Sequence, residues 1–350
     1  MSLKYKGNMD SERKATRHTS KVSSSCLWMK VSIAVFLAVI LIGLTVSSEY
    51  MLHYALQPEM GAYVEQERID NFRNDYSFGA PWIDSILAAG GLRDTFIVNR
   101  KGERLHGYYI YADSVTDKTA VLVHGYTDCA LKMLFIGYLY HHDLGFNLLL
   151  PDLHYHGLSE GKYVQMGWLD RLDVLEWIEL ADSLFGGNAQ MVVHGISMGA
   201  ATTMMLSGED VPECVRCYVE DCGYTSVWDE FAGEVRNQFH LPSFPLLYAA
   251  STLCKVQLGW SFGEASSLRQ VRKCYRPMLF IHGEQDDYVP TEMVYRLYEA
   301  KPQPKALWIA PGSPHAWSYH DHPAEYTRQV RQFLSRYLDN FQVRETSLMD

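Results

Sequence analysis

A serine in the pentapeptide Gly195-Ile196-Ser197-Met198-Gly199 has the sequence surroundings of an enzymatic nucleophile. An apolar run typical of a buried strand precedes it, and a helix-forming segment that begins Ala200-Ala201 follows it. A sharp strand-to-helix turn requires glycine on both sides of the serine, because a Cβ there would collide with neighbouring chain. Such a turn exposes the Ser197 hydroxyl at a helix N-terminus, where backbone N–H groups attract an anion. Ser197 is therefore the candidate nucleophile.

Two further residues complete the chemistry that a serine nucleophile needs. A base must remove the hydroxyl proton, and a carboxylate must orient that base. His315 is the candidate base, since it follows the last run predicted as a strand. Asp286 is the candidate orienting acid after the preceding strand, with its neighbour Asp287 as a close rival and Asp221, after an earlier strand, as a distant one. The chain order serine, acid, histidine is one that a serine nucleophile on such a strand-to-helix turn uses.

A tetrahedral intermediate also needs at least two donors for its oxyanion. The backbone N–H of Met198 is one candidate, because this residue follows the nucleophile. The other is expected from the loop after the strand 120–123, where Gly125 permits a tight turn and the N–H of Tyr126 is the candidate donor.

Apolar, β-branched runs recur between helix-length amphipathic stretches from Asp94 onward. This alternation predicts an α/β fold with a mostly parallel, doubly wound sheet covered on both faces. The carboxyl ends of its parallel strands meet at one edge, so the candidate site residues are expected to converge there. One of the amphipathic stretches, Met166 to Leu184, is predicted as a helix. The predicted strands are 95–98, 107–111, 120–123, 146–150, 191–194, 217–220, 277–281 and 306–309.

The interval between Cys222 and Arg276 breaks this alternation, since it is rich in aromatic residues, is interrupted by Pro242 and Pro245, and shows no strand pattern. Two interpretations stay open. The interval is either an extra helical layer or a lid that shapes an apolar substrate pocket over the strand edge. In both cases it is expected as a small helical cap of about residues 223–276 inside a hydrolase domain of residues 94–340.

Taken together, these motifs resemble the α/β-hydrolase superfamily and, within it, the bacterial esterase and serine-aminopeptidase-like branch with an N-terminal membrane segment. The resemblance covers about residues 94–338. It implies Ser197, Asp286 and His315 as a catalytic triad, with Tyr126 and Met198 as oxyanion donors. One segment departs from the family pattern, because His154 stands where an arginine is usual. The segments that carry the resemblance are 124–127, 151–161, 195–199, 282–286 and 312–315.

Charge and motif content exclude several other classes. Residues 31–350 hold 24 basic and 39 acidic residues, a net charge of −15, which repels phosphate backbones and makes nucleic acid an unfavourable partner. No glycine-rich phosphate loop predicts a nucleotide cofactor, and the histidine groups lack the spacing of a zinc site. No cofactor and no metal are expected. The expected partner is a small-molecule ester or amide substrate.

An uncharged apolar segment, residues 31–48, follows a tail in which residues 1–30 carry seven basic and two acidic groups. This segment is at the short end of what spans a bilayer. The positive-inside rule keeps the tail cytoplasmic and places the rest on the non-cytoplasmic side. Three interpretations stay open: a retained signal anchor, a signal peptide cleaved near Ser48 so that the protein is secreted, and a buried core helix. Met29 is an alternative start, and residues 49–93 are expected as a helical lead-in.

The sequence therefore predicts a serine hydrolase that cleaves a carboxylic ester, or alternatively an amide, through an acyl-enzyme on Ser197. The alternative from another class is a membrane-tethered binding protein that keeps the fold but has no catalytic activity.

Overall fold

The computed structural model describes residues 7–341 of the chain, with side chains from Cys26 onward. Its centre is an eight-stranded sheet in the order β1-β2-β4-β3-β5-β6-β7-β8. The pairs β1–β2 and β2–β4 are antiparallel, and the others are parallel. All eight predicted strands and the mostly parallel sheet are confirmed. The strands are β1 Arg93–Val98, β2 Arg104–Ile110, β3 Lys118–Val123, β4 Asn147–Pro151, β5 Gln190–Ile196, β6 Val215–Asp221, β7 Met278–Gly283 and β8 Lys305–Ala310.

Helices cover both faces of this sheet, because successive side chains of a buried strand point to opposite faces. In β3, Val121 and Val123 pack on one face with helices α5, α6, α9 and α10, whereas Ala120 and Leu122 pack on the other with α2, α3, α4 and α12. The helices of the first face are α5 Asp170–Leu184, α6 Met198–Leu206, α9 Ser267–Val271 and α10 Glu292–Ala300. Those of the second are α2 Glu65–Asp75, α3 Ala80–Ala88, α4 Leu134–Tyr138 and α12 Pro323–Leu334. The shorter elements are η1 Ser77–Gly79, η2 Ala130–Met133, η3 Leu139–Asp143 and α11 Ser318–Asp321.

Helix α5 begins four residues later than the sequence predicts. Met166 and Gly167 both adopt positive φ, 50° and 78°, and a left-handed pair cannot continue into a right-handed helix. The amphipathic spacing therefore extends beyond the helix into the preceding turn.

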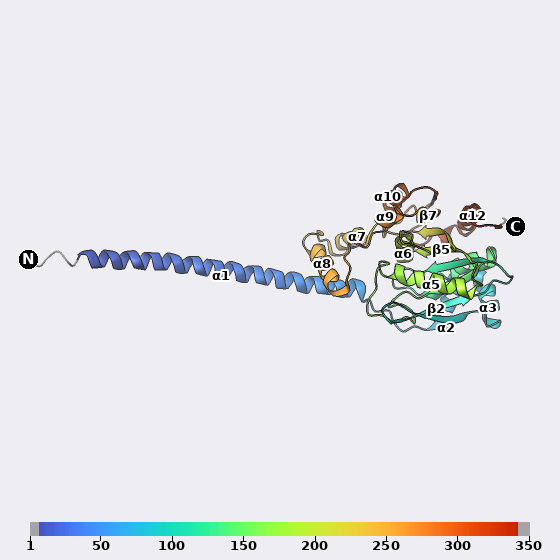
Figure 1. The fold of residues 1–350 in the computed structure, drawn as a ribbon, viewed down its shortest axis with the longest axis horizontal. Helices are drawn as coiled ribbons and strands as arrows, with labels where there is room; N and C mark the ends of the chain where they lie inside the picture. The colour runs from blue at the N-terminus through green and yellow to red at the C-terminus, as the bar shows by residue number, and fades with distance from the viewer. Residues whose placement is uncertain (1–6, 342–350) are drawn as a thin grey trace, which may run out of the picture.

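A single long helix, α1 Gly7–Leu56, projects from the domain (Figure 1). Its segment 26–56 is apolar and long enough to cross a membrane, and its most apolar window is only 6% buried. A core helix would be covered by the domain, so that interpretation of the apolar segment is wrong. Residues 1–6 of the expected basic tail, and the side chains up to residue 25, lie outside the described part.

The aromatic-rich interval after β6 is helical. It contains α7 Val227–Phe239, α8 Leu246–Leu258 and the short α9. Helix α8 packs against the end of α1 where that helix enters the domain (Figure 1). The lead-in between α1 and β1 contains α2, η1 and α3.

Candidate active site

Ser197 lies at the turn from β5 into α6, in a backbone conformation that is rare for a residue with a side chain, φ 56° and ψ −117°. The flanking glycines make this turn sterically accessible. A Cβ on Gly195 would lie 2.0 Å from the carbonyl oxygen of Gly199, and a Cβ on Gly199 would lie 2.0 Å from that of Val123. Both separations are far below contact distance, so the predicted need for glycine at these two positions is confirmed.

Three side chains from three loops form one hydrogen-bonded chain at the carboxyl edge of the sheet. The Ser197 Oγ lies 2.9 Å from His315 Nε2, and His315 Nδ1 lies 2.7 Å from Asp286 Oδ2. Asp286 follows β7 and His315 follows β8. Because an ionised carboxylate only accepts, Nδ1 of the histidine carries the proton and Nε2 is free to accept from the serine hydroxyl.

Asp286 rather than Asp287 contacts the histidine. The Asp286 side chain is buried and its Oδ1 accepts backbone N–H bonds from Tyr288 at 3.1 Å and Val289 at 2.9 Å. Asp287 is exposed to solvent. Burial opposes ionisation of Asp286, but hydrogen bonds from His282 and His315 outweigh it and lower the pKa of this carboxyl below its ordinary value.

The distant rival, Asp221, is occupied elsewhere. Tyr326 donates its hydroxyl to Asp221 Oδ2 at 3.1 Å and Ser318 donates to Oδ1 at 3.3 Å, which ties β6 to α11 and α12. Burial raises the pKa of Asp221 to about 6. This carboxyl therefore has structural partners of its own behind the serine–histidine pair.

The loop after β3 brings its backbone beside the serine. A Cβ on Gly125 would lie 3.5 Å from the Cβ of Ser197, so Gly125, the residue before Tyr126, lies close beside the candidate nucleophile. The His124 ring holds this loop, because its Nδ1 donates to the carbonyl of Gly125 at 2.8 Å while its Nε2 accepts the N–H of Leu153 at 3.0 Å. On the other side of the serine, Met198 is the first residue of α6, where an N–H has no partner within the helix.

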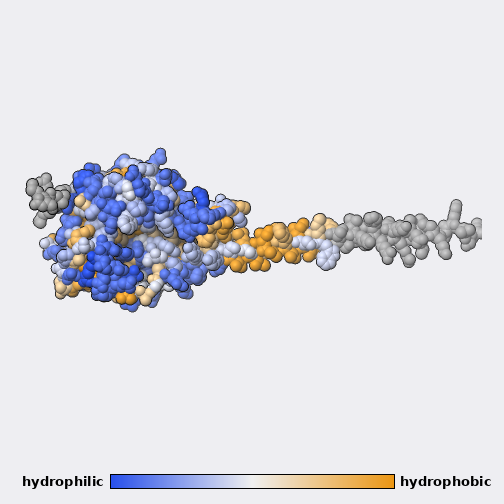
Figure 2. Space-filling view, turned by 180° about the vertical axis from the view of Figure 1, so that it is seen from behind, coloured by the Kyte–Doolittle hydropathy of each residue, from blue (hydrophilic) through white to orange (hydrophobic). Residues whose placement is uncertain are grey.

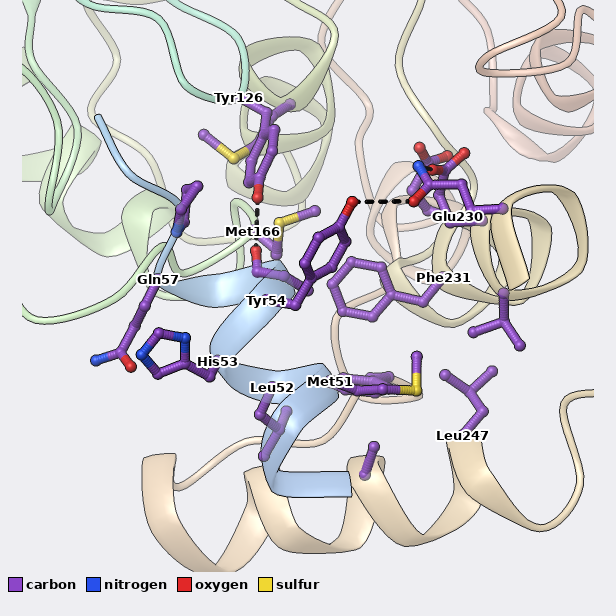
Figure 3. A pocket seen from close by; sticks show the side chains of 18 of the residues that line it. Met51, Leu52, His53, Tyr54, Gln57, Tyr126, Met166, Glu230, Phe231 and Leu247 are labelled. Atoms are coloured by element: carbon purple, nitrogen blue, oxygen red, sulfur yellow. Dashed lines mark hydrogen bonds between the residues drawn. The ribbon is translucent and has the colours of Figure 1, made fainter. Parts of the chain in front are cut away.

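A cavity of about 510 Å³ adjoins Ser197. One wall comes from the helical interval after β6, including Phe231 and Leu247, and another comes from the end of α1 and the residues just after it (Figure 3). The Tyr126 hydroxyl fastens this second wall by donating to the carbonyl of Ala55 at 2.8 Å. The residues of the α1 wall are Met51, Leu52, His53, Tyr54, Ala55, Gln57, Pro58 and Glu59.

Reasoning from the sequence missed this α1 wall, since it found no functional signal in residues 49–93. A signal does exist. Leu52 and Leu56 continue the apolar pattern at helical spacing beyond Glu49, the first acidic residue after the apolar segment, and both are buried in the domain core. Such spacing indicates that the apolar helix runs on into a packed contact instead of ending in a linker.

An acidic pair lies in the cavity wall on α7. Glu230 is 5% exposed and its Oε2 has no hydrogen-bond partner among the described residues, and Glu234 follows one helical turn later. Burial raises the pKa of Glu230 to about 8, so its carboxyl is largely protonated at neutral pH. Glu230 lies across the cavity from Tyr54, whose hydroxyl bonds Gln238 at 3.1 Å (Figure 3). The cavity therefore carries a neutral polar group in an otherwise mainly apolar lining.

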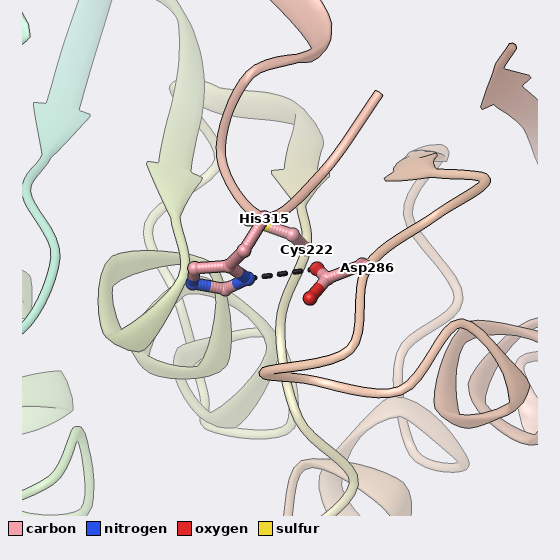
Figure 4. A group of neighbouring side chains, drawn as sticks. All are labelled: Cys222, Asp286 and His315. Atoms are coloured by element: carbon pink, nitrogen blue, oxygen red, sulfur yellow. Dashed lines mark hydrogen bonds and ion pairs between the residues drawn. The ribbon is translucent and has the colours of Figure 1, made fainter. Parts of the chain in front are cut away.

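Cys222 approaches Asp286 and His315 closely enough that the three could surround a metal ion (Figure 4). Their chemistry does not favour one. Burial and the nearby Asp221 and Asp286 raise the pKa of the Cys222 thiol well above its ordinary value, and only a thiolate is a strong metal ligand. The histidine nitrogen nearest the carboxylate already donates to it. Cys222 is a packing neighbour of the hydrogen-bonded pair.

His154, which stands where the resemblance implies an arginine, bridges two neighbouring segments. Its Nδ1 lies 2.9 Å from the carbonyl of Tyr163 and its Nε2 lies 3.0 Å from a carboxylate oxygen of Glu103. The neighbouring Asp152 accepts from Ala130 N at 2.7 Å and holds the same loop in place. The departure from the family pattern leaves the arrangement around Ser197 intact.

Comparisons with known proteins agree with this architecture. The model of the prolyl oligopeptidase family matches residues 155–341, a stretch that contains Ser197, Asp286 and His315. The uncharacterized protein YqkD of Bacillus subtilis is 34% identical over 239 residues, which are 68% of this chain and 78% of that protein.

Two solved structures show the same fold. The esterase Pf2001 of Pyrococcus furiosus superposes with a TM-score of 0.57 at 25% identity and covers 70% of this chain and 92% of its own. An acylaminoacyl peptidase of Pyrococcus horikoshii superposes with a TM-score of 0.55 at 16% identity and covers 72% of this chain but only 42% of its own. The second likeness concerns the fold alone.

Proposed function

This chain belongs to the prolyl oligopeptidase family of α/β-fold serine hydrolases, and from that premise we propose that it hydrolyses carboxylic esters through an acyl-enzyme on Ser197. The observation that carries the proposal is the continuous hydrogen-bonded chain from the Ser197 hydroxyl through His315 to a buried, ionised Asp286 at the base of an apolar cavity.

In the proposed acylation step, His315 Nε2 takes the hydroxyl proton while Ser197 Oγ bonds to the carbonyl carbon of the substrate. The carbonyl oxygen becomes an oxyanion, and the N–H groups of Tyr126 and Met198 donate to it. Asp286 keeps its negative charge and stabilises the imidazolium. The imidazolium then passes the proton to the departing alkoxide, so that the alcohol leaves and the acyl group stays on Ser197.

Deacylation repeats the sequence with water. His315 removes a proton from a water molecule as its oxygen bonds to the acyl carbon, and the same two N–H groups hold the second oxyanion. The proton then returns to Ser197 Oγ as the bond to the acyl carbon breaks, which releases a carboxylic acid and restores the serine.

An ester is the favoured bond, because its alkoxide leaves more easily than an amine and the cavity wall is mainly apolar. Glu234, half-buried in the cavity wall one helical turn after Glu230, supports a second candidate, an amide substrate with a free amino group, since a carboxylate can bind an ammonium ion. Esterase Pf2001 and the acylaminoacyl peptidase are both similar in fold, so both bond classes belong in the test.

The test is labelling with a fluorophosphonate probe, followed by a panel of acyl esters from acetyl to long-chain and an aminoacyl anilide. The wild type and the Ser114→Ala control, which removes an exposed hydroxyl in the loop before β3, are expected to label equally. Ser197→Ala is expected not to label. Absence of labelling in the wild type would instead favour the membrane-tethered binding protein without catalytic activity.

We also propose that α1 is a retained anchor and that the domain lies on the non-cytoplasmic side. Basic groups precede its apolar segment and acidic groups follow it. Leu44 and Ser48, which lie at or before a cleavage site near Ser48, are half-buried and buried in the folded structure, which supports retention of the helix. The mass of the mature protein in the membrane fraction tests this, since cleavage would shorten the chain and release it.

A further inference from the structure

The apolar segment of α1 ends at the level of the cap. Residues 31–48 span about 27 Å at helical rise, close to the hydrocarbon thickness of about 30 Å. A bilayer must therefore take up nearly all of this segment. Ser48 is nevertheless buried and Leu44 is half-buried, because α8 packs against this part of α1. Gln257 at the end of α8 also donates to Glu49 at 2.8 Å. The cap thus reaches the membrane boundary.

Helix α8 lies across α1 instead of alongside it. Figure 3 shows the helix that carries Leu247 running across the lower end of the α1 segment, below Leu52. A helix that crosses a membrane-spanning helix in this way lies in the plane of the bilayer. Amphipathic helices that bind the lipid interface adopt the same orientation.

The surface at this end is apolar. The segment from Leu241 to Cys254 contains no charged residue, and Leu241, Phe244 and Tyr248 are exposed by 46%, 71% and 54%. Val256 is exposed by 77% one helical turn beyond Thr252. Figure 2 shows the hydrophobic surface of α1 continuing onto the adjoining end of the domain. An aromatic and aliphatic patch joined to a membrane-spanning helix has the composition of an interfacial contact.

The cavity beside Ser197 extends toward the part of α1 that lies at the membrane boundary. Its α1 wall runs from Ala55, whose carbonyl accepts the Tyr126 hydroxyl, to Met51, a distance of about 6 Å along the helix axis. Met51 is two residues beyond Glu49, the first charged residue after the apolar segment. One end of the cavity is therefore at the nucleophile and the other is about one helical turn or less from the membrane boundary.

We propose that the segment 241–256, the interfacial segment, lies in the lipid headgroup region beside α1, and that Ser197 acts on membrane-resident acyl esters whose chain enters the cavity from the bilayer. The substrate class rests on the proposed function, whereas the position of the interfacial segment does not. An acyl chain that leaves the bilayer at Met51 passes Leu52, Phe231 and Leu247 and carries its ester carbonyl to Ser197 without crossing water.

The position is tested on the full chain without turnover. A Ser197→Ala, Cys26→Ser, Cys214→Ser protein receives a single reactive cysteine at Phe244→Cys, or at Val115→Cys as the matched control, and each is labelled with an environment-sensitive fluorophore. Val115 is fully exposed in the loop before β3, at the edge of the sheet opposite the site. In phosphatidylcholine vesicles with a spin label near the top of the acyl chains, the label at 244 should lose most of its emission and the label at 115 should keep it. Equal emission at the two positions would overturn the proposal, as would a label at 244 that is shielded from water but not quenched by lipid, which would indicate a second copy of the chain on this face.

The substrate class is tested with two esters, dioleoylglycerol in phosphatidylcholine vesicles and soluble p-nitrophenyl acetate. Phe244→Asp is expected to lower hydrolysis of the vesicle substrate about tenfold, because an aspartate resists the lipid boundary, and to leave the acetate unchanged. Phe244→Leu should leave both unchanged. Equal rates for Phe244→Asp and wild type on the vesicle substrate would refute the route. If wild type hydrolyses neither ester while the label at 244 is quenched, the proposed function fails and the membrane contact stands.

Discussion

Replacing Asp286 by asparagine should inactivate the enzyme by moving the proton of the His315 ring from Nδ1 to Nε2. The carboxyl Oδ1 of Asp286 accepts two backbone N–H groups, from Tyr288 and Val289. An asparagine must keep its oxygen there, because an amide nitrogen would face two donors. Its NH2 group then takes the place of Oδ2, 2.7 Å from His315 Nδ1. An NH2 group only donates, so the imidazole must move its proton to Nε2.

A histidine protonated on Nε2 cannot accept the proton of Ser197. Loss of the correct tautomer costs a serine hydrolase about ten-thousand-fold in rate, or about 5.4 kcal/mol of transition-state stabilisation. The assay is kcat/KM on p-nitrophenyl acetate together with the rate of fluorophosphonate labelling. Thermal unfolding verifies that Asp286→Asn is folded.

Asp287→Asn is the matched control, since it makes the same chemical change one residue away on an exposed side chain. We expect its kcat/KM to stay within about twofold of wild type, as for most surface substitutions. The reasoning would be refuted if Asp286→Asn stayed within about tenfold of wild type, or if Asp287→Asn fell as far as Asp286→Asn.

Three further predictions concern single contacts. Burial raises the pKa of Glu230 to about 8, so folding takes up a proton at pH values between its unfolded pKa and about 8, and the contribution of Glu230 to the free energy of unfolding should fall by up to about 1.4 kcal/mol per pH unit from pH 5 to pH 8. Urea titrations at several pH values should therefore show a weaker pH dependence of stability for Glu230→Gln. An unchanged pH dependence would contradict the burial argument. Gly199→Ala should prevent folding or lower the free energy of unfolding by more than about 3 kcal/mol, because the added Cβ would collide with the Val123 carbonyl. The control Gly233→Ala in α7 adds a Cβ that contacts nothing and should be neutral or slightly stabilising. Thermal or urea unfolding measures both. Tyr126→Phe should cost about 1 kcal/mol of stability through its lost bond to the α1 wall but leave kcat on p-nitrophenyl acetate nearly unchanged, since its backbone N–H remains; a large loss of kcat would mean that the hydroxyl itself takes part.

The sequence predicted the strands and the three side chains that meet, for a physical reason. A parallel sheet places every strand end at one edge, so motifs after β5, β7 and β8 converge whatever the intervening helices do. The sequence alone could not decide between Asp286 and Asp287, because neighbouring loop residues differ only in where their side chains point. The start of α5 was misplaced for a similar reason, since hydrophobic spacing does not report the left-handed turn at Met166.

The α1 wall of the cavity could not be predicted from the sequence, for a different reason. Its formation depends on where a long helix docks, and that docking is set by contacts with α8, about 200 residues away along the chain. Local patterns report that Leu52 and Leu56 face something apolar but not what they face. The raised pKa of Glu230 likewise arises only once α7 packs onto the domain and buries this side chain.

Because α1 supplies part of the cavity, its last turns are subject to selection for substrate as well as for the proposed role of this helix as an anchor. A soluble form that begins after Glu59 would lack the eight residues of the α1 wall, including Met51 and Tyr54. Such a form would have a different substrate range from the full chain. Among relatives, the end of α1 and the facing residues of α7 and α8 should change together, while the apolar turns before Leu44 should vary freely within the limits of hydrophobicity and length.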